Sequence, residues 1–409
     1  MNTHCFFLFL MTMLSLPASA ITISYRYDAA RRLTSVDYNG TSRTAFGYDK
    51  NGNLLSRTST VTGATAPPAL AAIYNGLFTN GTPAITNTGS LTLTLLASGS
   101  FTGRVTIEGV AYAISGTFDA AGNTTPKFIN RAGTLTDLTL NLALDVDGGT
   151  QQITGQITDG VFTSTVVMDA VRYNTTTNLV PAGLAMKFTA LFKQTQVAPT
   201  IPLGPGYATI TINTAGTILL AGKLPNNIAI SQTSTLVGLA SWPMFIPLHV
   251  NKGCLAGTVN FSWKPGISDF EGSITWVKPF TTGTYYPAAF TTPLSLVGSR
   301  FDAAVAGQRV LNYRAVSPNA VLTATDGNLI ASPLTKSFTL TSANAFTVPV
   351  DANAIKLTPT LTTGYFTGSF KDGAVTRLLY GVLFQESNTG GGFFTGTTLS
   401  GEVKIEGLP

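Results

Sequence analysis

The aromatic residues downstream of Phe261 are the best candidates for ligand-binding side chains in this sequence. They are Trp263, Trp276, Tyr285 and Tyr286. A flat ring that is exposed beside polar groups can stack on a sugar, whereas a buried ring belongs to the core of a sheet. Phe261 and Trp263 share one face of an expected strand, as do Ile274 and Trp276, because residues two apart in a strand point the same way. This pairing favours the core interpretation for both tryptophans, and sugar binding is the alternative.

Residues for nucleophilic catalysis are scarce. The chain has two histidines, of which His4 lies in the expected leader and His249 lies in an apolar run. Cys254 follows five positions after His249, but a thiol beside Leu255 is typical of a small buried hydrophobic residue. No Gly-x-Ser-x-Gly elbow, His-Glu-x-x-His motif or phosphate-binding loop is present. We therefore expect no enzymatic activity, no cofactor and no metal.

Two pairs of carboxylates form the alternative catalytic hypothesis. Asp145 with Asp147, and Asp269 with Glu271, are each spaced so that both side chains share one face of a strand. Paired carboxylates can hydrolyse glycosides. Both pairs lie beside glycines, so hairpin turns and solvated strand ends are the favoured interpretation.

Two short segments near the N-terminus repeat one pattern. Tyr27-Asp28 and Tyr48-Asp49 lie 21 residues apart (48 − 27), and each is followed by a turn position and a leucine. Asn51-Gly52 supplies the positive φ that a tight turn needs, whereas Arg31 takes the place of the glycine in the first copy. The pattern resembles the YD repeat of bacterial Rhs-type surface and toxin proteins. The resemblance implies β-hairpins over residues 21–57 and a bacterial cell-surface location.

The same second copy also matches part of a calcium loop. Asp49, Asn51 and Asn53 place oxygen-bearing side chains at the first, third and fifth positions. Thr60 stands where a calcium loop has its bidentate glutamate. The turn interpretation accounts for the same residues without a metal.

The N-terminus and the composition indicate an exported protein. Residues 1–20 are typical of a secretory signal peptide, with an apolar run from Phe6 to Leu16 and small residues at Ala18 and Ala20. Cleavage would leave Cys254 as the only thiol, which excludes an internal disulfide. Later apolar runs fall short of roughly 18 residues, so we expect no integral membrane span. The formal charge of +5 is spread along the chain, which argues against a nucleic-acid partner.

Hydrophobic alternation predicts an all-β fold. Leu91 to Leu95, Ala208 to Ile212 and Val403 to Ile405 alternate with period two, as half-buried strands do. Glycine and proline recur too often for long helices. The expected architecture is an antiparallel meander that forms two tandem barrel-like or sandwich-like domains.

Segments rich in proline and small residues suggest the domain boundaries. We predict a linker at 58–70, a first β domain at 71–193 with about eight strands, a second linker at 194–206, and a second β domain at 207–409. The predicted function is that of a secreted or cell-surface structural, adhesive or binding protein without catalytic activity. Its expected partner is a cell-surface polysaccharide or another surface protein. A secreted carbohydrate-binding or carbohydrate-active protein and an outer-membrane β-barrel are the alternatives.

Overall fold

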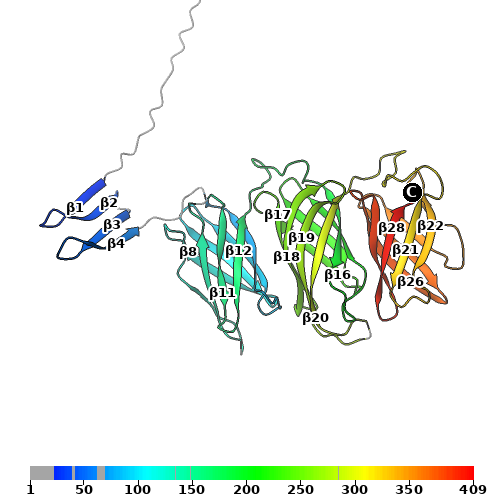
Figure 1. The fold of residues 1–409 in the computed structure, drawn as a ribbon, viewed down its shortest axis with the longest axis horizontal. Helices are drawn as coiled ribbons and strands as arrows, with labels where there is room; N and C mark the ends of the chain where they lie inside the picture. Colours follow the sequence, from blue (N-terminus) through cyan, green and yellow to red (C-terminus); the bar gives the residue numbers. More distant parts are fainter. Residues whose placement is uncertain (1–22, 39–41, 62–69, 134, 148, 284) are drawn as a thin grey trace, which may run out of the picture. The chain divides into compact units, whose positions relative to one another are not determined.

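The chain forms two compact units that divide between Ala64 and Thr65. The computed structural model describes residues 23–38, 42–61, 70–133, 135–147, 149–283 and 285–409. The expected signal peptide at 1–20 lies outside these residues. The expected all-β class is confirmed, because antiparallel strands make up both units (Figure 1). Within the described ranges, no helix has the length and apolarity needed to cross a membrane.

The N-terminal unit is a four-stranded antiparallel sheet with its strands in sequence order. Its strands are β1 (Ile23–Tyr27), β2 (Leu33–Tyr38), β3 (Ser42–Tyr48) and β4 (Leu54–Val61). The two tyrosine-aspartate segments connect β1 to β2 and β3 to β4. Both pairings carry a register shift next to the tyrosine, at Tyr27 and at Tyr48.

The second unit contains three sheets of eight strands each. The first sheet has β5 (Ile73–Thr79), β6 (Gly89–Leu95), β7 (Ser100–Ile107), β8 (Val110–Thr117), β9 (Lys127–Ile129), β10 (Leu138–Leu144), β11 (Gln152–Thr158) and β12 (Thr163–Ala170). The second has β13 (Lys187–Gln194), β14 (Gly206–Ile212), β15 (Thr217–Lys223), β16 (Ala229–Thr235), β17 (Ser241–Leu248), β18 (Gly253–Lys264), β19 (Ser268–Lys278) and β20 (Phe290–Arg300). The third has β21 (Ala320–Asp326), β22 (Leu334–Leu340), β23 (Phe346–Thr347), β24 (Lys356–Thr360), β25 (Tyr365–Asp372), β26 (Val375–Phe384), β27 (Thr389–Thr395) and β28 (Ser400–Gly407).

All three sheets share one topology. The first strand of each sheet pairs with its last strand, as β5 does with β12, and the other strands follow in sequence order on either side. The two strands at the ends of the hydrogen-bonded order contact each other in every sheet: β8 and β9 in the first, β16 and β17 in the second, and β23 and β24 in the third. Each sheet is therefore a nearly closed meander, which confirms the barrel-like form of the expected antiparallel architecture.

Each barrel-like sheet encloses its own apolar core. Along β6, Leu91, Leu93 and Leu95 are buried while Thr92 and Thr94 are exposed, as the alternation predicts. Burial of one such leucine contributes about 1.5–3 kcal/mol. A further apolar cluster joins the second sheet to the third. It consists of Leu191, Tyr207, Val382, Phe384 and Phe393.

The domain division expected from the sequence differs from the observed sheets. Residues 194–206 connect β13 to β14, which pair directly through Ala190 and Ala208. This segment therefore lies inside the second sheet, and the region expected to hold two domains holds three sheets. Loops between strands use the same prolines and glycines as linkers between domains, so composition alone does not distinguish them.

Candidate functional site

The two candidate tryptophans lie in different environments. Trp276 has no exposed surface and packs edge-on against Phe290, with 4.9 Å between ring centroids. Trp263 is 66% exposed near the end of β18. The core interpretation is right for Trp276 and wrong for Trp263. The pairing of β18 with β19 shifts register between Phe261 and Lys264, and a bulge of this kind reorients the side chains that it contains.

The two candidate tyrosines are held by hydrogen bonds, and Tyr286 joins the second sheet to β28 of the third. Tyr286 is buried, and its hydroxyl accepts hydrogen bonds from the backbone N–H of Ser400 at 2.8 Å and of Leu203 at 3.3 Å. The half-buried Tyr285 donates its hydroxyl to the Pro225 carbonyl at 3.3 Å. Burial raises the pKa of Tyr285, and the neighbouring Tyr286 raises it further. Neither tyrosine lines the cavity that contains Trp263.

Trp263 lines a cavity of about 470 Å³, which we call the Trp263 cleft. The hairpin of β18 and β19 supplies Trp263 and Asp269, and the end of β20 and the chain after it supply Arg300 and Asp302. The connection from β26 to β27 supplies a glutamine and a glutamate. The complete lining is Gly183, Trp263, Asp269, Arg300, Asp302, Gln385 and Glu386.

Glu386 holds the indole and the β18–β19 turn in place. The indole Nε1 of Trp263 donates to Glu386 Oε1 at 3.2 Å, and the backbone N–H of Gly266 donates to the same oxygen at 2.5 Å. The backbone N–H of Glu386 donates in turn to Ser299 Oγ at 2.9 Å. The exposed ring is therefore oriented by its nitrogen, and it keeps a large accessible surface for a partner.

Three carboxylates and one guanidinium line the cleft together with the ring. Arg300 pairs with Asp302, with 3.1 Å from Nε to Oδ1, and its backbone N–H donates to Asp269 Oδ2 at 2.6 Å. Burial raises the pKa of Asp269, and the negative charge of Glu386 raises it further. The hydrogen bond from the Arg300 backbone lowers this pKa but does not cancel the increase. An oriented ring beside carboxylates, an amide and a guanidinium can bind a polyhydroxylated ligand.

In the described part of the chain, the carboxylate pairs considered for glycoside hydrolysis do not face a common cavity. Glu271 accepts from Lys264 Nζ at 2.6 Å and from Ser268 Oγ at 3.0 Å, and it lines a different cavity from Asp269. Asp145 accepts from the backbone N–H and the hydroxyl of Thr150. Asp147 lies exposed in the same connection. Each side chain is explained by its turn or strand end, without a shared substrate position.

His249 and Cys254 do not form a nucleophile and base. Cys254 is buried, and burial raises the pKa of its thiol to about 12. Burial lowers the pKa of His249, and the nearby charge of Lys278 lowers it further. Among the described residues, His249 Nε2 is buried without a hydrogen-bond partner, and no group of three or more His, Cys, Asp or Glu side chains could hold a metal.

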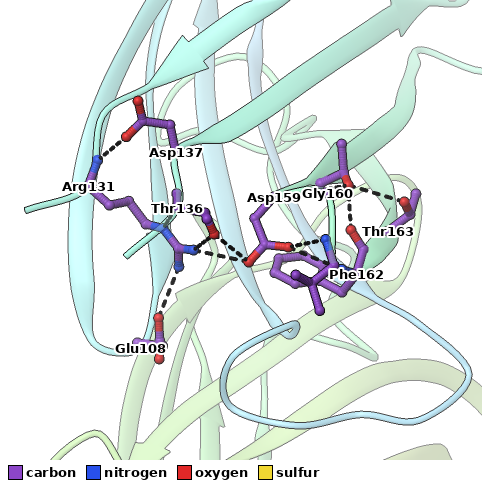
Figure 2. A network of polar contacts seen from close by, with 10 residues as sticks. Glu108, Arg131, Thr136, Asp137, Asp159, Gly160, Phe162 and Thr163 are labelled. Carbon is purple, nitrogen blue, oxygen red and sulfur yellow. Dashed lines mark hydrogen bonds and ion pairs between the residues drawn. The ribbon is translucent and has the colours of Figure 1, made fainter. Parts of the chain in front are cut away.

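A buried ionic network in the first sheet was not anticipated from the sequence (Figure 2). The side chain of Arg131 is 3% exposed and pairs with Glu108 and Asp159, each at 3.1 Å. Its Nε donates to the Thr136 carbonyl at 2.5 Å, and its backbone N–H donates to Asp137. The arginine thus joins the β7–β8, β9–β10 and β11–β12 connections. Because the partners of Arg131 come from three turns of one sheet, we interpret this network as one that stabilises the sheet.

The tyrosine-aspartate segments share one turn geometry. Asp28 Oδ1 accepts from the backbone N–H groups two and four residues later, both at 2.9 Å, and Asp49 Oδ1 does the same at 2.9 and 2.8 Å. The equivalent positions Arg31 and Gly52 have φ of 62° and 92°. Arg31 therefore adopts the left-handed conformation that Gly52 adopts without strain. The carboxylates serve as turn caps, and this explains them without calcium.

Comparisons with known proteins give no close relative. The chain matches no protein-family model and no curated protein. Among solved structures, it is similar to isotype 1 transferrin binding protein B from serogroup B Neisseria meningitidis, with 9% identity, coverage of 96% of this chain and 85% of that chain, and a TM-score of 0.21. It is also similar to a protein of unknown function from the DUF3598 family of Nostoc punctiforme PCC 73102, with 10% identity, coverage of 56% and 96%, and a TM-score of 0.20. A double mutant of transferrin binding protein B from Haemophilus parasuis Hp5 gives 9% identity, coverage of 94% and 84%, and a TM-score of 0.19. Likenesses at these scores carry no argument about this chain.

Proposed function

We propose that this chain is an exported, non-catalytic binding protein that holds a cell-surface carbohydrate in the Trp263 cleft. The observation that carries the proposal is the exposed ring of Trp263, oriented by Glu386 beside Asp269, Asp302 and Arg300. The cleft volume of about 470 Å³ lies within the range of small-ligand sites, roughly 300–1,000 Å³.

The geometry supports recognition better than catalysis. Stacking of a sugar ring on an indole uses a flat apolar face, and the carboxylates at its rim provide hydrogen-bond acceptors. The Gln385 amide fixes the rim, since its Nε2 donates to the carbonyls of Asp302 and Val310. Asp302 is committed to an ion pair with Arg300, and Glu386 already orients Trp263 and the turn. These carboxylates position the binding surface, which leaves Asp269 without a free acid-base partner in the cleft.

The N-terminal sheet supports the cell-surface part of the proposal only through its resemblance to YD repeats. We propose that this sheet displays the second unit outside the cell, after cleavage of residues 1–20. Mass spectrometry of the protein purified from an exporting bacterium is expected to find Ile21 as the first residue. A product that begins at Met1 would contradict export.

Substitution of Trp263 tests the carbohydrate proposal. Trp263→Ala is expected to leave the melting temperature nearly unchanged, because the ring is 66% exposed, and to weaken retention on immobilised bacterial polysaccharide about tenfold or more. Phe128→Ala is the matched control, since Phe128 is 76% exposed on β9 and lines no described cavity. Full retention by Trp263→Ala would refute the proposal.

A further inference from the structure

A second cavity lies between the first and second sheets. Its volume is about 820 Å³, and we call it the intersheet cleft. One wall consists of β5 and β12, and the other consists of β18 and β19. It shares no lining residue with the Trp263 cleft.

The walls are the outer faces of two barrel-like sheets. On β5, Asn75 and Thr79 point away from the core that buries Tyr74 and Phe78. On the other wall strands, too, every second side chain points outward and lines the cleft. They are Thr165, Val167 and Asp169 on β12, Ala256, Thr258 and Asn260 on β18, and Glu271, Ser273 and Thr275 on β19. The walls are thus rich in hydroxyl and amide groups with small apolar patches between them.

The backbone of these walls is already paired. β5 pairs with β6 and β12, and β12 also pairs with β11. β18 pairs with β17 and β19, and β19 also pairs with β20. An extended peptide therefore cannot join either wall by strand addition, which needs a free edge. A ligand in this cleft must therefore be recognised by side chains.

The polar groups favour a neutral ligand that donates hydrogen bonds. Asn75 Oδ1 is buried and has no hydrogen-bond partner within the protein, and such an atom is costly unless a donor reaches it. Asp169 and Glu271 add carboxylate acceptors. Among the described residues, the cleft lining includes no lysine or arginine, and Lys264, which pairs with Glu271, lies outside the lining. The lining therefore offers an anionic ligand carboxylates and no cation.

We propose that the intersheet cleft is a second binding site, and that it takes a neutral oligosaccharide. A hydroxyl-rich chain supplies donors for Asn75, Asp169 and Glu271 and acceptors for the threonine and serine hydroxyls. The site uses residues other than those of the proposed function, and the two sites together would let one protein hold a polysaccharide at two points.

The test uses the full-length exported protein and calorimetric titration. The probes are maltohexaose, cellohexaose and mannohexaose, with hexagalacturonate as the acidic comparison. Thr165→Arg narrows the cleft from an exposed position on β12, and Thr102→Arg places the same change on the exposed face of β7, outside the cleft. Both are made in the Trp263→Ala background, which removes the other site.

We expect Trp263→Ala alone to bind one of the neutral hexasaccharides, Thr165→Arg to weaken that binding about tenfold or more, and Thr102→Arg to leave it unchanged. Hexagalacturonate should bind more weakly than the best neutral probe. The inference is overturned if Trp263→Ala binds no neutral probe, or if Thr165→Arg binds as Thr102→Arg does. Loss of polysaccharide retention in Trp263→Ala, together with either of those results, would sustain the proposed function alone.

Discussion

Replacement of Arg131 with methionine should destabilise the first sheet. Arg131 is the cation that Glu108 and Asp159 share, and its side chain is 3% exposed. Methionine replaces the aliphatic part of the side chain and removes its charge and its donors. The change leaves the Asp159 carboxylate, 11% exposed, without its partner. It also releases the Thr136 carbonyl that accepts from Nε.

The magnitude follows from the burial of the two acids. Removal of one member of a buried ion pair costs about 3–5 kcal/mol. Glu108 is 26% exposed, so water can stabilise it after the change, whereas Asp159 is nearly enclosed. We therefore expect a loss of about 3 kcal/mol, at the lower end of that range.

Hydrogen–deuterium exchange is the appropriate measurement. All three tryptophans of the chain lie on strands of the second sheet, so tryptophan fluorescence does not report on the first. A loss of 3 kcal/mol should speed exchange of the protected β10 and β11 amides about 100-fold. Arg104→Met, at an exposed position on β7, is the matched control and should leave that exchange unchanged.

The pH dependence of the same variant tests the role of Asp159. Burial would raise the pKa of this carboxyl, but hydrogen bonds from the backbone N–H groups of Phe162 and Val161, the Thr136 hydroxyl and the Arg131 charge lower it overall. A lowered folded-state pKa stabilises the fold at neutral pH, and this contribution is lost as pH falls through that pKa. The difference between Arg131→Met and the parent should therefore shrink below about pH 4. A difference under about 1 kcal/mol at pH 7 would refute the reasoning, because that is the range of a solvent-exposed pair.

Three further predictions follow from the packing and the turns. Trp276→Ala should cost about 3–5 kcal/mol and lower the denaturant midpoint of the second sheet, because the ring is fully buried. Cys254 should resist iodoacetamide at pH 8 in the folded protein and react after unfolding, because burial raises its thiol pKa to about 12, and rapid labelling of the native protein would contradict this. Arg31→Gly should stabilise the N-terminal sheet by about 1 kcal/mol and Gly52→Ala should destabilise it similarly, since both positions have positive φ; amide exchange of residues 23–61 measures both.

Local patterns predicted the strands but not their grouping into sheets. Alternation placed Leu91, Leu93 and Leu95 on the buried face of β6, as observed. The second sheet depends on the pairing of Ala190 with Gly298, which are distant in the sequence. No periodicity within β13 or β20 carries that information, so the loop at 194–206 was interpreted as a domain boundary.

The residues of the Trp263 cleft also could not be grouped from the sequence alone. Trp263 and Trp276 have similar neighbours in sequence, and the register shift beside Phe261 separates their environments. The partners of Trp263 come from the end of β20 and from the β26–β27 connection. The sequence could therefore suggest the tryptophan, while Asp302 and Glu386 became candidates only through the fold.

The turn chemistry also decides which residues can carry the YD resemblance. Asp119, between β8 and β9, accepts from the N–H groups of Ala121 and Asn123 at 2.9 and 2.8 Å, and Gly122 has a φ of 82°. This is the geometry of Asp28 and Asp49, but Phe118 stands in place of the tyrosine. The aspartate and the glycine therefore indicate a hairpin turn in general. The specific part of the pattern is the tyrosine. The Tyr48 hydroxyl donates to the Leu33 carbonyl at 2.9 Å and ties one hairpin to the other, a contact that Phe118 cannot make.

Tyr48→Phe should therefore loosen the pairing of the two hairpins without opening either turn. Unchanged amide exchange throughout β1 to β4 in that variant would mean that the tyrosine has no structural role in the repeat.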